Sequence, residues 1–243
     1  MSSLPDASLL PQAVLRPVRG HHAFEACVEQ LATAIRLGVY PHGTALPAER
    51  ELAEQLGVSR ATLREAIAAL RAAGLVETTR GRGGGTVVKR TARRRSTARA
   101  AIRGRHDDLM DSLRFRSVVE PGAAALAAER DLDQRTRRLL ETSLAAVSAA
   151  PAGDERRQCD SRLHLAIAAA SGSPRLMAAV TQVQGELDEM LHAIPVLSVN
   201  IAHSTAQHEA IVAAVLGGNA RKAARVMTEH CDDTAALLRG LLG

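Results

Sequence analysis

The stretch Leu46–Val88 constrains the fold more than any other part of the chain. It begins with two short helical patterns separated by the turn Gly57-Val58-Ser59, and in each pattern apolar residues recur at three- and four-residue spacing. Two β-like runs, 75–77 and 86–88, follow on either side of a glycine-rich tip, where residues without a Cβ accept positive φ. With a further amphipathic helix over 23–37, the stretch predicts three helices and a small β-wing, the outline of a winged helix-turn-helix.

The remainder of the chain predicts an all-α bundle. Only three residues of 243 are aromatic, so the cores must be built from Leu, Ala, Val and Ile, which suits helices better than sheets. Asp, Pro and Gly residues mark the breaks between the helical patterns. We therefore expect a mainly α protein whose second half has about six helices, at roughly 107–129, 132–149, 154–171, 174–192, 198–217 and 219–240.

These patterns divide the chain into four parts. Residues 1–20 contain three prolines and no periodicity, which predicts a disordered lead-in. Residues 21–90 form the predicted winged helix-turn-helix domain, and residues 91–106 form an arginine-rich linker. Residues 107–243 form the predicted helical domain, which we expect to bind an effector and to dimerise.

Charge is distributed unevenly between the two halves. Residues 1–105 contain 17 Lys and Arg against 8 Asp and Glu, whereas residues 106–243 contain 14 against 18. The asymmetry indicates a polyanion-binding half, although residues 21–90 alone are nearly balanced, with 9 basic and 7 acidic side chains. The three cysteines lack CxxC spacing, and neither a signal peptide nor a membrane span is evident. We therefore expect a cytoplasmic protein without a membrane partner.

The second helical pattern, which follows the turn Gly57-Val58-Ser59, is the predicted DNA-reading helix. Its apolar side packs inward, so Arg60, Thr62 and Arg64 on its first turns would face the bases and phosphates. The alternative is that these are ordinary solvent-facing residues of a small helical domain.

The pattern LP-A-ER-ELA-LGVSR-TLREAI-AL-GLVE followed by GRGGGTVV resembles the DNA-binding domain of the GntR family of bacterial transcription regulators. The resemblance covers about residues 24–88. It implies that four further positions contact DNA, namely Arg50, Ser59 and, in the wing, Arg82 and Gly83.

Four residues of the second half form a candidate divalent metal site. Asp160 and His164 lie four apart on one helical face, and His208 and His230 occur on two further predicted helices. Three imidazoles and one carboxylate suit Zn²⁺, with Ni²⁺ or Mn²⁺ as alternatives. Spacing alone nevertheless favours separate surface or core histidines.

The bundle is similar to the ligand-binding domain of the FadR-type (FCD) subfamily of GntR regulators. Many members hold a metal with an Asp-x-x-x-His pair and two later histidines, and Asp160, His164, His208 and His230 fall on those positions. The resemblance therefore implies a metal site. It also implies that Arg116 points into the cavity, where it could clamp a small acid. The alternative is a salt bridge from Arg116 to Glu120, four residues on, and the sequence leaves the two open.

The leading hypothesis is a homodimeric, metabolite-responsive transcription factor that binds a palindromic operator in double-stranded DNA, most simply as a repressor. Its effector would be a small organic acid. One competing hypothesis is a metal-dependent hydrolase or lyase with an accessory DNA-binding segment, which lacks a positioned general base. The other is a sequence-independent architectural DNA protein, against which the acidic second half argues.

Overall fold

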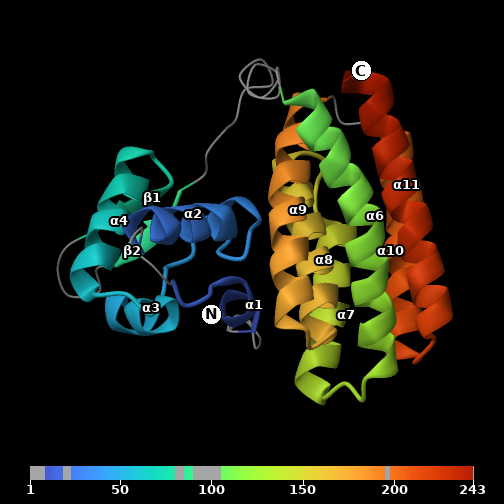
Figure 1. Ribbon diagram of the computed structural model, residues 1–243, viewed down its shortest axis with the longest axis horizontal. Helices are drawn as coiled ribbons and strands as arrows, with labels where there is room; N and C mark the ends of the chain where they lie inside the picture. The colour runs from blue at the N-terminus through green and yellow to red at the C-terminus, as the bar shows by residue number, and fades with distance from the viewer. Residues whose placement is uncertain (1–8, 19–22, 80–84, 90–104, 195–197, 243) are drawn as a thin grey trace. The chain divides into compact units, whose positions relative to one another are not determined.

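The computed structural model describes residues 9–18, 23–79, 85–89, 105–194 and 198–242. These residues divide into two compact units, one within Ala7–Ala92 and the other within Arg93–Gly243. Figure 1 labels their helices and strands. None of the helices within the described ranges is long and apolar enough to cross a membrane.

The smaller unit contains the helix-turn-helix. Helices α2 and α3 both pack against α4, and Leu31, Leu52 and Leu63 are completely buried among them. Gly57 ends α3 at φ 64°, a left-handed conformation that glycine adopts without strain, and Ser59 then caps α4 by accepting the Thr62 N–H. The predicted turn is therefore confirmed. The bounds are α2 (Ala23–Arg36), α3 (Glu49–Leu56) and α4 (Arg60–Ala72).

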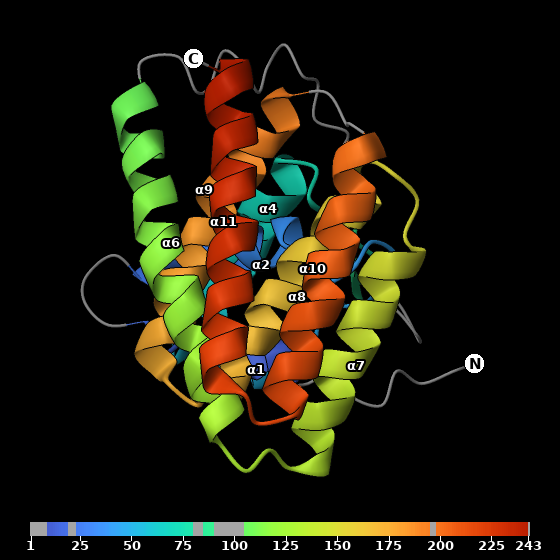
Figure 2. The same ribbon diagram turned by 90° about the vertical axis from the view of Figure 1, so that its right-hand side faces the viewer.

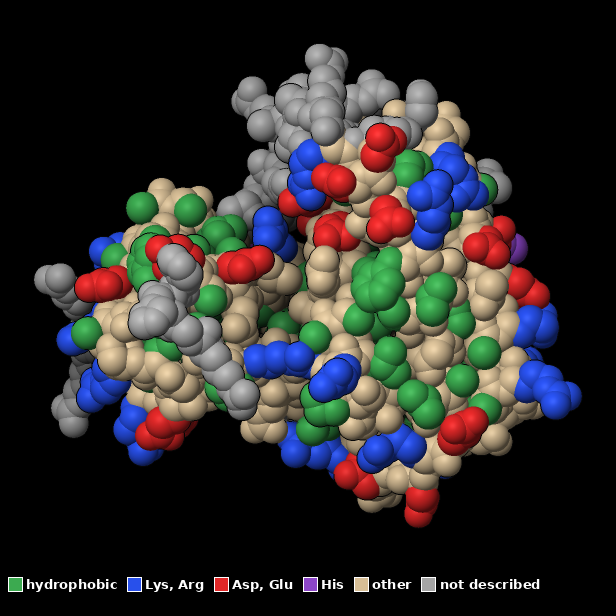
Figure 3. Space-filling view, viewed as in Figure 1, with side chains coloured by type: hydrophobic (Ala, Val, Ile, Leu, Met, Phe, Trp, Pro, Cys, Tyr) green, Lys and Arg blue, Asp and Glu red, His purple; other side chains and the backbone are tan. Residues whose placement is uncertain are grey.

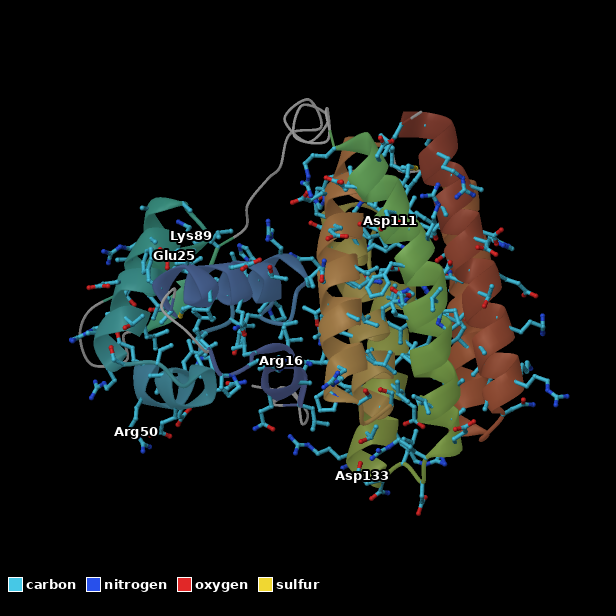
Figure 4. The ribbon with its side chains drawn as sticks, in the orientation of Figure 1. Arg16, Glu25, Arg50, Lys89, Asp111 and Asp133 are labelled. Atoms are coloured by element: carbon cyan, nitrogen blue, oxygen red, sulfur yellow. The ribbon has the colours of Figure 1, made fainter. Side chains whose placement is uncertain are left out.

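A two-stranded antiparallel sheet follows the helices. Strands β1 (Val76–Thr78) and β2 (Thr86–Val88) pair with Val76 opposite Val88, and the Leu46 N–H donates to the Thr86 carbonyl at 2.8 Å. Lys89, labelled in Figure 4, pairs with Glu77 at 2.8 Å across the sheet. The predicted pair of strands is thus present, shifted by one residue in β1, while the tip that joins them lies outside the described residues.

The part of the lead-in that the structure describes is ordered, contrary to the prediction for residues 1–20. Helix α1 (Leu9–Val14) packs against α2, and Leu10 and Val14 are buried. The Gln55 amide donates to the Pro11 carbonyl, and the Val18 N–H donates to the Leu56 carbonyl, both at 2.7 Å. These contacts with α2 and α3 stabilise a helix that is too short to be stable alone.

The larger unit is the predicted six-helix bundle. Helix α6 packs against α8, α9, α10 and α11, and α7 packs against α8 and α10. Figure 2 shows α6, α11, α10 and α7 side by side, with α8 and α9 behind them. Helix α7 begins two residues later than expected because Asp133 is its N-cap and accepts the Thr136 N–H at 2.7 Å. The bounds are α6 (His106–Glu129), α7 (Gln134–Ala149), α8 (Asp154–Ala170), α9 (Pro174–Ala193), α10 (Ser198–Leu216) and α11 (Ala220–Leu242).

His192 links α9 to the start of α8, and this contact predicts a pH-dependent stability. Its Nδ1 lies 3.2 Å from Asp188 Oδ1 and its Nε2 lies 3.4 Å from Asp154 Oδ1. Burial acts to lower the pKa of His192, but the hydrogen bond and charge of Asp188 outweigh it and raise the pKa. A raised pKa in the folded state stabilises the protein below the unfolded value of about 6.5, and the contribution is lost as pH rises through the folded pKa.

His192→Gln is therefore expected to lower the free energy of unfolding more at pH 5.5 than at pH 8.5, as measured by urea denaturation. His42→Gln, an exposed position in the other unit, is the control. An equal loss at both pH values for His192→Gln would contradict the charged pairing.

Candidate metal centre and DNA-reading surface

Three histidines from three helices meet in the middle of the bundle. His164 lies on α8, His208 on α10 and His230 on α11, and all three are buried. One nitrogen of each ring lies within 4.8 Å of the others, and the ring centroids are 4.7 to 5.4 Å apart. The sequence favoured separate histidines on spacing alone, whereas the topology of the bundle brings them together.

Asp160 stands beside two of these rings. Its Oδ1 lies 3.4 Å from His208 Nε2, and its Oδ2 lies 3.8 Å from His164 Nε2. Two ligands that each bind one ion at about 2.0–2.2 Å lie roughly 3–4 Å apart, so these separations match a shared ion. All four residues of the predicted metal set are therefore adjacent.

The imidazole nitrogens of the cluster are buried, and three of them form no hydrogen bond with the residues that the structure describes, which suits them to bind a metal ion. His164 Nε2 and both ring nitrogens of His208 form no hydrogen bond within the described part of the chain. Burial lowers the pKa of His208 to about 4 and also holds the pKa of His230 well below its usual value. Both rings are consequently neutral at pH 7, the state in which an imidazole nitrogen offers a lone pair to a metal.

Glu120 supports the cluster from α6, a role that the sequence did not reveal. Its Oε2 lies 2.6 Å from His164 Nδ1, and its Oε1 accepts the Gln184 amide at 2.6 Å and the Arg116 Nε at 3.1 Å. Burial acts to raise the pKa of Glu120, but Arg116 and His164 outweigh it and keep the carboxylate ionised. A carboxylate on Nδ1 fixes the ring so that Nε2 faces the cluster. The signal in the sequence was a lone glutamate inside the apolar run Val118–Ala128.

Gln207 supports the cluster from α10. Its Oε1 accepts His230 Nδ1 at 3.0 Å, and its amide nitrogen donates to Asp233 Oδ2 at 2.7 Å, which fixes the orientation of the amide. His203 Nε2 lies 2.9 Å from the same Asp233 oxygen. With Nδ1 occupied in this way, His230 has Nε2 left for a metal.

Arg116 forms the salt bridge that the sequence offered as the alternative to an effector contact. Arg116 and Glu120 are 1% and 2% exposed, so the pair is fully buried. Arg116 also lines the pocket beside the cluster, together with Asp160 and His230, and its Nη1 has no hydrogen-bond partner among the described residues. The salt bridge and a contact with a ligand are therefore compatible.

Removing the Arg116 charge is expected to destabilise the bundle. Arg116→Met keeps most of the volume but leaves the Glu120 carboxylate buried without its cation, which costs about 3–5 kcal/mol for a buried pair. Urea denaturation measures the loss. Arg114→Met is the matched control. Arg114 is exposed and its ion pair with Asp111, at 3.9 Å, is weak, so this substitution should lower the free energy of unfolding by less than about 1 kcal/mol. Equal effects of the two substitutions would show that Arg116 does not compensate Glu120.

The predicted DNA-reading residues are located at the start of α4. Arg60 and Arg64 are exposed one turn apart, and no carboxylate of the described residues pairs with either. Ser59 and Thr62 share a hydrogen bond of 2.8 Å between their hydroxyls beside the helix N-terminus. The buried side of α4 is formed by Leu63, Ala66, Ile67 and Leu70.

Arg50 projects from the first turn of α3 into solvent, as Figure 4 shows. It pairs with Glu54 at 3.5 Å, but both side chains are about 70% exposed, and an exposed pair of this kind is weak. The guanidinium is therefore accessible to a phosphate. The two wing positions of the prediction, Arg82 and Gly83, lie outside the described residues.

The acidic neighbours of the histidines in sequence are not placed to act as a general base. Glu209 and Glu229 are both exposed, and Glu229 pairs with Arg225 at 2.6 Å on the surface of α11. This agrees with the expectation from helical geometry that neither would face the cluster. The arrangement suits the binding of an ion and a ligand.

Comparisons with known proteins agree with both halves of the chain. Residues 24–88 match the family described as bacterial regulatory proteins, gntR family, and residues 111–233 match the FCD domain. The HTH-type transcriptional regulator Mce2R of Mycobacterium tuberculosis is 34% identical over 228 residues, covering 88% of this chain and 92% of that protein. LutR of Bacillus subtilis, also an HTH-type transcriptional regulator, is 29% identical over 213 residues, covering 85% and 96%.

A solved structure supports the fold. McbR/YncC of E. coli has a TM-score of 0.54 and 20% identity, covering 91% of this chain and 99% of that chain. The relatives and both matched domains are those of transcriptional regulators, so the enzyme hypothesis has no support from them. The chain belongs to the GntR family of bacterial transcriptional regulators and carries the C-terminal FCD domain of its FadR-type members.

Proposed function

We propose that the protein is a homodimeric repressor whose operator affinity is controlled by a small organic acid bound beside a divalent metal ion. The observation that carries the effector half is the buried cluster of His164, His208 and His230 with Asp160 beside it. The ion would be Zn²⁺, with Ni²⁺ or Mn²⁺ as alternatives, because imidazole nitrogens suit all three. A regulator of operator DNA acts in the cytoplasm.

The chain's own residues have distinct roles in this proposal. His164, His208, His230 and Asp160 would hold the ion, which would supply a positive charge that attracts the carboxylate of an acid. Glu120 and Gln207 orient the rings of His164 and His230. Arg116 lines the same pocket and offers a guanidinium to the acid's second oxygen.

In the DNA-binding half, we propose that Arg60 and Arg64 read base edges from α4. Ser59, Thr62 and Arg50 would hold the phosphates, as would Arg82 and Gly83 in the wing. A single recognition helix reads only a few base pairs, so a two-fold dimer on a palindrome gives the needed specificity.

A surface of α6 supports the dimer. Phe115, Val118 and Leu126 are 43%, 70% and 42% exposed along this helix. Figure 3 shows hydrophobic side chains gathered over the middle of this face of the bundle. Exposed apolar patches of this kind are often covered by a partner, and a second copy of the chain is the partner that a palindrome requires.

Selection from randomised duplex DNA tests the DNA-binding half of the proposal. The full-length protein is expected to enrich a palindrome whose half-sites are about 10 base pairs, or a multiple of this, from centre to centre. Enrichment of one unrepeated half-site would contradict the dimer. The absence of any enriched sequence would instead indicate an architectural DNA protein.

A further inference from the structure

The pocket beside the histidine cluster has a polar end and an aliphatic end. Residues of α6, α8, α9, α10 and α11 line it, and its empty volume is about 730 Å³, open solvent at the mouth included. Asp160, His230 and Arg116 define the polar end. The aliphatic end determines which acids the pocket can accommodate.

The direction of the pocket follows from two antiparallel helices. On α11 the lining residues His230, Thr234 and Leu237 lie on successive turns. On α10, Ser204 and Ile201 run the same way from the cluster, because Gln207 pairs with His230 and His203 pairs with Asp233. At about 1.5 Å per residue, Leu237 lies roughly 10 Å along the helix from His230.

The walls away from the cluster are aliphatic on three helices or their ends. Leu187 and Leu191 of α9 form one part of these walls, together with Ile194, which directly follows α9. Ile201 of α10 and Leu237 of α11 form the rest. Leu187 and Ile194 belong to a buried apolar cluster, and Leu191 and Leu237 pack against it. These walls offer van der Waals contact and few hydrogen bonds.

Three of the four polar side chains along this stretch, those of Thr234, Arg156 and Arg157 but not Ser204, have partners that the structure describes. The Thr234 hydroxyl donates to the His230 carbonyl at 3.0 Å. Arg156 donates to the Val147 carbonyl and the Thr205 hydroxyl, both at 2.6 Å. Arg157 pairs with Asp154 at 3.4 Å. A ligand with several hydroxyls would lose hydration here without regaining its hydrogen bonds.

We infer that the effector is a monocarboxylic acid with an unbranched aliphatic chain. Its carboxylate lies at the polar end, beside His230 and Arg116, and its chain extends along Ile201 and Leu237. This inference rests on the proposed function, because it assigns the chemical class of the acid sensed at that site. Short hydroxy acids and sugar acids present the same carboxylate but leave the aliphatic walls without contacts.

Isothermal titration calorimetry on the full-length, zinc-loaded protein tests the inference with butanoate, hexanoate, octanoate, gluconate and hexanedioate. Each added methylene is expected to tighten binding about fourfold until the chain fills the pocket. Hexanoate is expected to bind more tightly than gluconate or hexanedioate of the same carbon number. Affinity that does not depend on chain length, or preference for gluconate or hexanedioate, would overturn the assignment while leaving acid sensing intact. Failure of every acid to bind would overturn both.

The substitution Leu237→Asn tests the contribution of the aliphatic wall to affinity separately from that of the polar end. It is expected to weaken octanoate binding about tenfold or more, as loss of a leucine contact implies, and to leave butanoate within about twofold. Leu176→Asn, at a partly exposed position in the first turn of α9 that does not line the pocket, is the matched control and should change neither affinity. If Leu237→Asn does not fold, Leu191→Asn, at another partly buried wall position, carries the same prediction. An equal loss for both acids would contradict the proposed direction of the chain.

Discussion

Replacing His208 and His230 together by alanine is expected to abolish stoichiometric metal binding. Both rings are buried, and one nitrogen of each lies within 4.8 Å of the others in the cluster. Two of the four proposed ligands would be lost, and His164 with Asp160 alone cannot form the closed set that holds an ion through dialysis. Metal analysis of dialysed protein is expected to fall from about one ion per chain to almost none.

His203→Ala is the matched control for this experiment. His203 lies on the same helix as His208, but it is exposed and pairs with Asp233 at 2.9 Å outside the cluster. It should retain the ion. Asp160→Asn, at a side chain that is 22% exposed, provides a second variant with less risk to folding and is expected to weaken metal binding. Full retention of metal by the double variant would exclude the cluster as the site.

Replacing Arg60 and Arg64 by alanine is expected to abolish operator preference. A guanidinium that donates two hydrogen bonds to guanine contributes about 1–3 kcal/mol of discrimination, or roughly 5- to 150-fold for each residue. Both side chains are exposed on the first turns of α4, so their loss should leave the fold intact. Fluorescence anisotropy with the selected operator and a scrambled duplex measures the preference.

Arg71→Ala is the matched control on the same helix. Arg71 has the same charge and is also exposed, but it lies in the last turn of α4, far from the N-terminal turns that enter a major groove. It is expected to weaken binding to both duplexes slightly and equally. If Arg71→Ala reduces preference as much as the double variant does, α4 does not read DNA through its first turns.

The sequence predicted the helices well because many of their ends depend on local signals. Gly57 ends α3 and Ser173 begins α9 through their own backbone or side chain, and such signals are visible in a single sequence. Helix α1 was missed for the opposite reason. Its six residues show no usable period, and its order depends on contacts with α2 and α3, more distant in the chain.

The candidate site was predicted only in part, for a related reason. The Asp160–His164 spacing is local, and His208 and His230 were visible on two further predicted helices, but only the family resemblance favoured one shared site over separate histidines. Glu120 meets Gln184 and Cys231 across separations of 64 and 111 residues, and only the topology brings such pairs together. For Arg116 the sequence could not decide between a salt bridge to Glu120 and a position in the pocket, and the structure shows that Arg116 has both.

The most direct test of the proposed regulator is the effect of a bound acid on operator affinity. Fluorescence anisotropy would measure the dissociation constant of the zinc-loaded protein for the selected operator, with and without saturating octanoate. We expect octanoate to weaken operator binding at least about fivefold in the wild type, the lower range of allosteric coupling. The His208→Ala/His230→Ala variant should still bind operator but not respond. An unchanged dissociation constant in the wild type with octanoate and with every other acid that binds it, or the same shift in the variant, would contradict control through the histidine cluster.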